Sequence, residues 1–565
     1  MKLSTPVIDA IVSQYPEAKA ADFAVATPPS LELGDVAVPM FSLAKKQHKA
    51  PHAIAQEIAG KIGEGGYIAS ATAAGPYVNF KLNRERVGAA IVTAIMENGA
   101  AWGSNASGKG QKVLIDHTSI NPNASPHVGR GRCAMIGDSI TRLLRFEGYD
   151  VEVHYYVNDM GRQIGLLVLI ADELQNLTFD QILDAYVKAN QRAEEDSDFA
   201  EKGYELLAKI EEGDPETQRK FHAVTDLCLK GQLSVLSRLN VSYDIFDRES
   251  LYVNDKRLGR IEDALIEKGA LFTDEDGRRV VDLSKLGFAA EEGRYFVLRR
   301  ANGSSMYGCR DLVYSIDKQE RGAAINMMVL GEDHKLYAQQ LALMLEAAGI
   351  PAPEVVYYAY ILLKDGKMST RQGKVVLLAD FLDQAAALAK QRVVEQFPDL
   401  SSGEHDAIAA QVAVAAIRFA VLRVKSNKNV TFDMESALSF QGDTGPYIQY
   451  SCARIRSILR KSEVPIPDSP DAAFAVGTDA EWLLLLKLAH FPEVIADAVA
   501  QRACSPIANY ALELAHTFTG FYHDCPVLSS GDANLTRTRL LLCRATLQTL
   551  SNALDILGIE TPERM

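Results

Sequence analysis

The pattern of apolar and polar positions changes twice along the chain. Residues 1–102 mix helical spacing with a short apolar segment, Tyr77–Leu82, which predicts a strand. The Gly- and Ser-rich residues 103–110 predict a flexible interdomain linker. Short apolar runs then alternate with helical spacing, and from about Ala385 the pattern is almost entirely helical. We therefore expect three domains, with approximate bounds 1–105, 109–384 and 385–565.

The central region has the alternation of a doubly wound sheet. Val113–Ile115 and Val151–Val157 are apolar runs typical of buried strands, and Ala134–Phe146 between them has helical spacing. Strand, helix and strand in this order form a βαβ unit. Two further parallel strands are expected at Met327–Leu330 and Val355–Leu362. We predict an α/β fold with a Rossmann-like, doubly wound parallel-sheet central domain, preceded by an N-terminal α+β domain.

A long, charged, helical stretch, residues 172–267, interrupts this alternation. We interpret it as an insertion in the parallel-sheet domain, followed by a return to the sheet. Beyond the sheet, apolar stripes at helical spacing predict a C-terminal helical bundle, because such stripes are buried by packing against one another. Helices are expected at residues 409–424, 444–459, 482–500, 507–522 and 537–557.

Composition is that of a soluble globular protein. The 565 residues exceed what one core usually holds, and 47% are hydrophobic and 23% charged. We expect no apolar run that could span a bilayer, and the N-terminus has no signal-peptide core. Seven dispersed cysteines, without CxxC or zinc spacing, predict no metal site and a reducing, cytoplasmic compartment.

The net charge of −14 by itself argues against a nucleic-acid partner, because phosphate binding needs clustered Lys and Arg. Two acid-free basic stretches, residues 411–430 and 452–461, oppose that conclusion. Two interpretations stay open for them: a solvated helix face, and contact with a polyanion. The basic residues concerned are Arg418, Arg423, Lys425 and Lys428 in the first stretch, and Arg454, Arg456, Arg460 and Lys461 in the second.

Two polar segments that follow strand-like runs carry the candidate chemistry. His127-Val128-Gly129-Arg130 comes after Val113–Ile115, at the sheet edge where open α/β folds bind ligands. Gly129 lets the backbone approach a nucleotide, and the following helix N-terminus favours phosphate. Residues 367–371, Lys-Met-Ser-Thr-Arg, offer cations and a hydroxyl for the β- and γ-phosphates of ATP. Each segment alone fits an ordinary polar turn or basic loop, but the pair favours ATP handling.

Together these segments resemble the two ATP signatures of class I aminoacyl-tRNA synthetases, and longer motifs resemble arginyl-tRNA synthetases in particular. The resemblance implies activation of L-arginine with ATP and Mg²⁺, and transfer of arginine to the 3′ end of arginine tRNA. It implies no tightly bound organic cofactor. We further expect a cytoplasmic monomer that needs no membrane. The motifs are residues 120–130, 136–139, 155–161, 307–312, 331–334, 367–373, 442–450 and 557–565.

The resemblance also implies roles for single residues. Arginine carries a planar fork of donors that carboxylates read best, so Asp116 and Asp311 are expected at its guanidinium, with Tyr307 beside them. Asn121 and His334 are expected at its α-amino and carboxylate end. The ATP-binding residues implied are His127, Gly129, Arg130, Lys367, Met368, Ser369 and Arg371, of which His127, Arg130, Lys367 and Arg371 are catalytic. The tRNA-binding residues implied are Arg454, Arg456 and Tyr447, in a helical anticodon-binding domain.

One position departs from the family pattern. The first signature usually ends in a second His, and here Arg130 stands there. The departure leaves open a second hypothesis, a catalytically altered paralogue that acts as a tRNA-binding or regulatory protein. A third hypothesis is an ATP-dependent ligase that arginylates a small molecule, which would not need the C-terminal helical domain.

Overall fold

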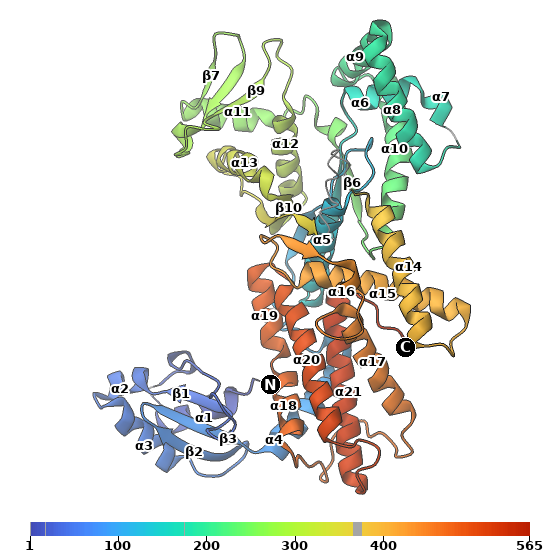
Figure 1. The fold of residues 1–565 in the computed structure, drawn as a ribbon. Helices are drawn as coiled ribbons and strands as arrows, with labels where there is room; N and C mark the ends of the chain where they lie inside the picture. Colours follow the sequence, from blue (N-terminus) through green and yellow to red (C-terminus); the bar gives the residue numbers. More distant parts are fainter. Residues whose placement is uncertain (1, 17, 175, 365–375) are drawn as a thin grey trace.

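The computed structural model describes residues 2–16, 18–174, 176–364 and 376–565 (Figure 1). The N-terminal region is a three-stranded antiparallel sheet, in the order β1-β3-β2, with helices packed on it. The predicted strand Tyr77–Leu82 is confirmed as its central strand, β3. The other elements here are α1 (Thr5–Gln14), β1 (Val36–Pro39), α2 (Phe41–Gln47), α3 (Pro51–Lys61) and β2 (Ile68–Ala74).

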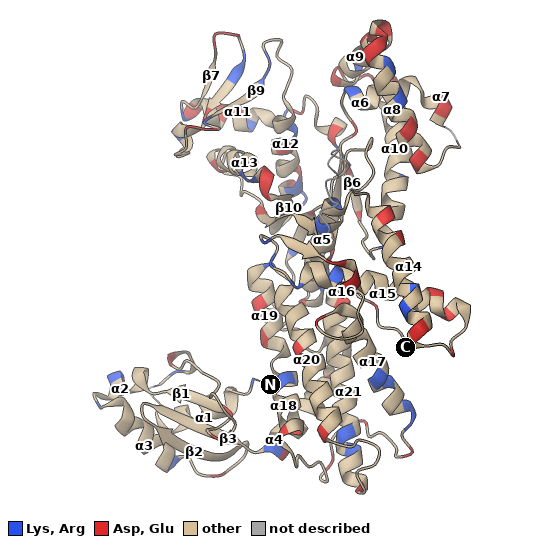
Figure 2. Ribbon diagram, viewed as in Figure 1, with Lys and Arg blue, Asp and Glu red and all other residues tan. Residues whose placement is uncertain are grey.

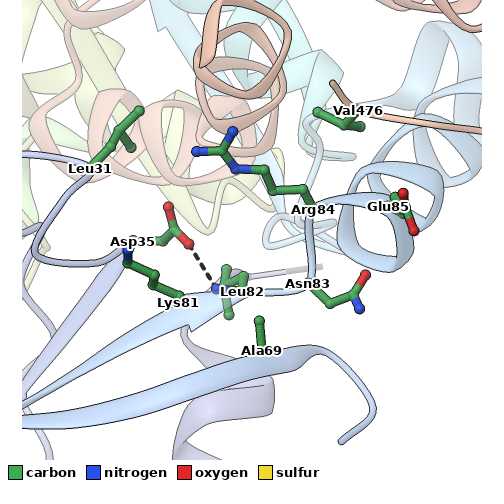
Figure 3. A pocket seen from close by; sticks show the side chains of 9 residues that line it. All are labelled: Leu31, Asp35, Ala69, Lys81, Leu82, Asn83, Arg84, Glu85 and Val476. Atoms are coloured by element: carbon green, nitrogen blue, oxygen red, sulfur yellow. Dashed lines mark hydrogen bonds between the residues drawn. The ribbon is translucent and has the colours of Figure 1, made fainter. Parts of the chain in front are cut away.

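Asp35 joins this sheet to the C-terminal bundle. One carboxylate oxygen accepts from the Leu82 backbone N–H at 2.7 Å, and the other accepts from the Trp482 indole N–H at 2.7 Å. Trp482 is fully buried, so its N–H needs this acceptor. Figure 3 shows Asp35 and Arg84 beside a cavity of about 420 Å³ at the same junction. The two regions are therefore held together by a specific polar contact.

Helix α4 (Arg84–Asn98) packs against α18 (Asp479–Ala489) and α21 (Ala533–Ile556) of the bundle. The stretch that follows is an ordered connection, not the free tether that the sequence suggested. Its backbone donates to the fully buried Glu147 from Asn105 at 2.8 Å and from Ser107 at 3.0 Å. Helix α4 lies within residues 1–105 but packs on the bundle. The predicted domain bounds stay a prediction.

The central sheet has five parallel strands in the order β11-β10-β4-β5-β6, which confirms the doubly wound fold. The chain runs outward from β4 through β5 to β6, then restarts on the other side of β4. The order therefore reverses between β4 and β10, where such sheets bind ligands. The elements are β4 (Lys112–Asp116), α5 (Val128–Phe146), β5 (Asp150–Val157), β6 (Ile245–Arg248), β10 (Ile325–Gly331), α13 (Lys335–Ala347) and β11 (Glu354–Tyr358).

The insertion predicted at residues 172–267 contains a strand of the central sheet, β6, and the inserted elements continue beyond it to Glu320. Between β5 and β6, five helices form their own apolar cluster: α6 (Arg162–Leu169), α7 (Ala171–Leu174), α8 (Phe179–Glu195), α9 (Ser197–Glu211) and α10 (Pro215–Ser237). Between β6 and β10 lies a small antiparallel sheet that sequence reasoning missed, because its strands are short and separated by turns. This part contains α11 (Leu258–Glu267), β7 (Leu271–Thr273), β8 (Arg279–Asp282), β9 (Tyr295–Arg299) and α12 (Tyr307–Glu320).

The single strand predicted at Val355–Leu362 is wrong. The central-sheet strand β11 ends at Tyr358, and Ile361–Leu363 forms β12, which pairs with β13 (Val430–Phe432) in a separate sheet. The chain leaves the central sheet because Ala359 binds elsewhere: its N–H donates to the Ser426 carbonyl at 2.9 Å, and its carbonyl accepts from Arg132.

The C-terminal bundle matches the predicted helices, with one break. Residues 482–500 form two helices, α18 and α19 (Phe491–Gln501), because Pro492 begins a new helix after His490. The remaining helices are α14 (Leu378–Gln396), α15 (Ser402–Leu422), α16 (Met434–Ala437), α17 (Gly445–Arg460) and α20 (Ser505–Asp524). Contrary to expectation, α15 is long and apolar enough to cross a membrane by length and composition; 67% of its apolar window is buried inside the protein.

Helix α5 connects the sheet to the bundle through two buried arginines. Arg418 of α15 donates to Asp138 and Ser139 on α5, and to the backbone carbonyls of Leu239 and Leu557. Arg132 of α5 donates to five backbone carbonyls, those of Ala359, Tyr360, Lys425, Ser426 and Lys428. Arg418 is therefore a structural ion-pair partner, and the interpretation of its basic stretch as a polyanion contact is wrong at this residue.

We expect Arg418→Met to lower the unfolding free energy of the sheet–bundle unit by about 3 kcal/mol, because it leaves buried Asp138 without this partner. Urea unfolding with the matched double variant Asp138→Asn/Arg418→Met checks this, since removing both charges should cost less than removing one. A single variant as stable as the unaltered protein would contradict the structural role.

Candidate active site

A cavity of about 750 Å³ opens at the carboxyl edge of the central sheet, where the strand order reverses between β4 and β10. Helices α12 and α13 stand on one side of this edge, and the helical insertion stands on the other (Figure 1). Open α/β sheets bind their ligands in this position. Six of the sequence-predicted residues line the cavity together: Asp116, Asn121, Arg130, Tyr307, Asp311 and His334.

Two of these residues are acids whose surroundings disfavour the charged form. Asp116 ends β4 and is buried, and burial raises its pKa. Asp311 lies in the second turn of α12 and accepts a hydrogen bond from the Tyr337 hydroxyl at 2.5 Å. Burial is the main cause that raises the pKa of Asp311 to about 7, against the effect of that hydrogen bond. A cationic ligand would stabilise both carboxylates in their ionised form.

A third acid, Glu249, lines the same cavity and was missed by sequence reasoning. It directly follows β6 and is 6% exposed, and its carboxylate pairs with Arg310 Nε at 2.5 Å. Buried Asp159 holds this turn by accepting from the Ser250 backbone N–H and hydroxyl, at 2.9 and 2.7 Å. The available signal was its position at a strand end, but the four-residue β6 was not predicted as a strand.

The backbone after β4 has an unusual conformation that shapes the cavity. Thr118 and Ser119 have φ angles of +79° and +44°, a left-handed conformation that costs energy for residues other than glycine. Arg130 Nη1 donates to the Thr118 carbonyl at 3.3 Å, and Tyr243 donates to the Thr118 hydroxyl at 2.7 Å. Ser119 Oγ donates to the Tyr156 carbonyl at 2.8 Å. These contacts hold the loop that carries Asn121 toward the cavity.

The first signature begins α5, with His127 as the N-cap. Burial lowers the pKa of His127, and the neighbouring charge of Arg130 lowers it further, so the imidazole is neutral at neutral pH. A side chain at Gly129 would lie 3.0 Å from the His127 ring, so glycine keeps this ring unobstructed. His127 is not among the residues that line the cavity, and it lies at the adjoining helix N-terminus.

The chain just beyond the second signature is hydrogen-bonded to the first. Val128 donates to the Val376 carbonyl at 3.2 Å, and Leu378 donates to the Pro126 carbonyl at 2.8 Å. The predicted ATP-binding residues Lys367, Met368, Ser369 and Arg371 lie outside the described residues. The described chain that resumes at Val376 therefore lies against the first signature.

The predicted tRNA-binding residues lie on α17, where Figure 2 shows basic residues gathered. The Arg454 guanidinium lies 4.7 Å from the ring centre of Tyr450 and 5.7 Å from that of Tyr522. Arg456 donates to the Pro562 carbonyl and the Thr561 hydroxyl, and Tyr447 bonds with Thr519. Arg456 and Tyr447 therefore have partners inside the domain, and their contact with RNA stays a prediction.

Metal ions need a set of donor side chains that lie close together. Within these residues, no group of three or more His, Cys, Asp or Glu could hold a metal ion. The seven cysteines are all buried and unpaired.

Three family models match consecutive parts of the chain. The arginyl tRNA synthetase N terminal domain matches residues 2–82, the class I (R) tRNA synthetase catalytic domain matches 91–434, and the DALR anticodon binding domain matches 448–565. Together they account for almost all of the sequence.

Curated relatives and solved structures agree with these models. The arginine–tRNA ligase of Methanopyrus kandleri is 36% identical, over 100% of this chain and 97% of that protein, and that of Methanocaldococcus jannaschii is 35% identical over 97% and 96%. Arginyl-tRNA synthetase from Thermus thermophilus covers both chains fully, with a TM-score of 0.80 and 29% identity. The Plasmodium falciparum enzyme shares the fold, with a TM-score of 0.77 at 20% identity over 99% and 98%. The chain belongs to the class I arginyl-tRNA synthetases, the arginine–tRNA ligases.

Proposed function

We propose that the 750 Å³ cavity is where L-arginine is activated with ATP, before arginine is transferred to the 3′ end of arginine tRNA. The observation that carries this proposal is the meeting of Asp116, Asp311 and Glu249 in one cavity beside the first ATP signature. Mg²⁺ enters the proposal as the companion of ATP, and no tightly bound organic cofactor is required.

The arginine end of the site is chemically selective. Three acidic groups, with Tyr307 at the rim, offer acceptors to the planar donor fork of a guanidinium. Lysine or ornithine would leave buried acceptors unpaired, which costs much more binding energy than a missing methylene. Asn121 and His334, which line the same cavity, are proposed to hold the α-amino and carboxylate end.

At the ATP end, a carboxylate oxygen of arginine attacks the α-phosphorus, and the bond to pyrophosphate breaks. Negative charge builds on the phosphorus oxygens and on the departing pyrophosphate, so fixed donors aimed there lower the barrier. His127, Gly129 and Arg130 are proposed on one side of the triphosphate. Lys367, Met368, Ser369 and Arg371 are proposed on the other, in a segment that begins after β12 and ends at the first signature.

The bundle is proposed to bind the tRNA anticodon, through Arg454, Arg456 and Tyr447 on α17. The DALR anticodon-binding model on residues 448–565 supports a tRNA substrate over a small-molecule acceptor. The proposal also includes a cytoplasmic monomer that works away from membranes; seven buried, unpaired cysteines fit a reducing compartment.

Arginine-dependent ATP–pyrophosphate exchange, with and without arginine tRNA, tests the proposal. We expect exchange with arginine and tRNA present, and little with lysine. No exchange, with tRNA binding intact, would instead favour the altered paralogue. Arginine transfer to a small molecule without tRNA would favour the third hypothesis. Truncating the bundle is a poor test, because Arg418 of α15 donates to Asp138 of α5 and the Leu557 carbonyl accepts from Ser139 of α5.

We expect Arg130→Ala to lower kcat strongly, by about 10²-fold or more, with a smaller change in the KM for arginine. The substitution removes a fixed positive charge near the phosphates, and this charge is needed in the chemical step. Arg130→His, which restores a donor of the usual family type, should retain much of the activity. Single-turnover adenylate formation is the measurement, and unchanged arginine activation by Arg130→Ala would contradict the assigned role.

We expect kcat/KM for arginine to rise with pH toward a plateau above about 7, because Asp311 must be ionised to accept a guanidinium and burial raises its pKa to about 7. Asp311→Asn should lose this acid limb and lower kcat/KM for arginine by about 10- to 100-fold. A raised carboxyl pKa means that stability is lost as pH rises from about 4 to 7, so the same substitution should raise Tm at pH 8.

A profile for Asp311→Asn that keeps the wild-type acid limb would assign that limb to another group. The KM for ATP serves as the internal control, since Asp311 is proposed at the amino-acid end only.

A further inference from the structure

Behind the cavity lies a lysine that neither ATP signature includes. Lys318 is on α12, two turns after Asp311, and is fully buried. Its ammonium nitrogen is 3.7 Å from Asp116 Oδ2 and 4.1 Å from the centre of the Tyr314 ring. Among the described residues it has no hydrogen-bond partner. A buried ammonium group without hydrogen bonds is costly, so its presence needs an explanation.

Packing alone does not explain this lysine, because an apolar side chain of similar length would fill the same space without the desolvation cost. What the ammonium supplies is charge. Asp247 is a second acid that acts on Lys318, but its carboxylate already has partners of its own. These are Arg321 at 2.9 Å, the Tyr314 hydroxyl at 2.9 Å and His154 at 2.5 Å. Among the described residues, the one acid within ion-pair distance of Lys318 is Asp116.

The charges at the amino-acid end of the cavity show what Lys318 changes. Three carboxylates, Asp116, Glu249 and Asp311, face two cations, Arg310 on Glu249 and Lys318 near Asp116. Asp311 is left without an ion-pair cation among the described residues, which matches one guanidinium. Arg130 also lines the cavity, but it bonds to the Thr118 carbonyl beside the first signature. Without Lys318, two buried carboxylates would lack a cation, and such groups take up protons instead of staying charged.

We propose that Lys318 is a positioning residue for arginine: its buried ammonium keeps Asp116 ionised in the empty cavity while leaving the carboxylate free to bind a cationic group of the substrate. The 3.7 Å separation is the key geometry, since it is close enough for strong attraction at low dielectric but too long for a hydrogen bond. The acceptor positions of Asp116 therefore remain available to arginine. This inference rests on the proposed function.

The surrounding charges agree with this role. The charged groups that face Lys318 are Asp116 on β4, Asp247 on β6, and Asp311 on the same helix as Lys318. Burial lowers the pKa of Lys318, whereas these three acids oppose that effect. Lys318 in turn is the main group that opposes the raised pKa of Asp116, with His154 on β5 adding to it and Asp247 acting against it.

The test is arginine charging by Lys318→Met, from pH 6 to 9, with arginine and ATP varied in turn. Methionine keeps an unbranched side chain, one atom shorter, and removes the charge. We expect the KM for arginine to rise about tenfold or more at pH 7, and the acid limb of kcat/KM for arginine to move about one pH unit upward. The KM for ATP should be unchanged. Lys318→Arg, which keeps the charge, should restore most of the affinity for arginine.

The double variant Asp116→Asn/Lys318→Met separates this role from simple packing. If Lys318 acts through Asp116, removing it from an Asp116→Asn background should change the KM for arginine by less than about twofold. This pair carries no buried charge, so it stays informative even where Lys318→Met alone does not fold. Thermal unfolding of each variant gives the folding control.

Two results would overturn the inference while leaving the proposed function standing. One is a folded Lys318→Met enzyme with the wild-type arginine KM and acid limb. The other is an equal loss from Lys318→Met with and without Asp116. A wild-type protein that does not charge tRNA with arginine would reject the proposed function and this inference with it.

Discussion

The architecture depends on the burial of helix α5 between the sheet and the bundle. Most of its nineteen residues are buried, and two of them make buried polar contacts with distant segments. Asp138 accepts from Arg418 of α15, and Arg132 donates to the carbonyls just before β12 and within residues 425–428. A buried charge without its partner is strongly destabilising, so these contacts fix how the two units meet. The first signature is the N-terminus of this same helix.

This constraint also places the proposed catalytic groups. Because α5 follows β4, the loop between them must cross the carboxyl edge of the sheet, and it does so through Thr118 and Ser119 with left-handed backbone. Gly137 on α5 leaves room for the buried His117 ring, which a side chain there would meet at 2.3 Å. The motif Ile136–Ser139 therefore belongs to the support of the site: Gly137 makes space, and Asp138 and Ser139 bind Arg418.

The proposed arginine site depends on how the charges of its acids are compensated, not only on the presence of these acids. Asp116, Glu249 and Asp311 come from three separate elements, and each has a different partner: Lys318 at a distance, Arg310 in contact, and the Tyr337 hydroxyl. Full neutralisation within the protein would leave nothing for a cation to bind, and no neutralisation would protonate the acids. The partial compensation seen here leaves acceptors that a guanidinium completes.

The sequence by itself determined the elements and the identity of the family. Apolar periodicity is local, so it predicted the βαβ unit around α5, strand β3 and most of the bundle helices. The family motifs carried Asn121, Arg130, Tyr307, Asp311 and His334, and Asp116 directly follows the predicted strand Val113–Ile115. Only the tertiary structure decided what depends on distant contacts. The short strands β6 and β7–β9 are stable only when paired, so the role of Glu249 was hidden, as was the end of β11 at Tyr358. In the sequence, Arg418, Arg132 and Lys318 cannot be told from other basic residues. Their roles depend on burial and on a partner from a distant part of the fold. These two factors, and not the residue type, decide whether a cation contacts solvent, a carbonyl or an acid of the cavity.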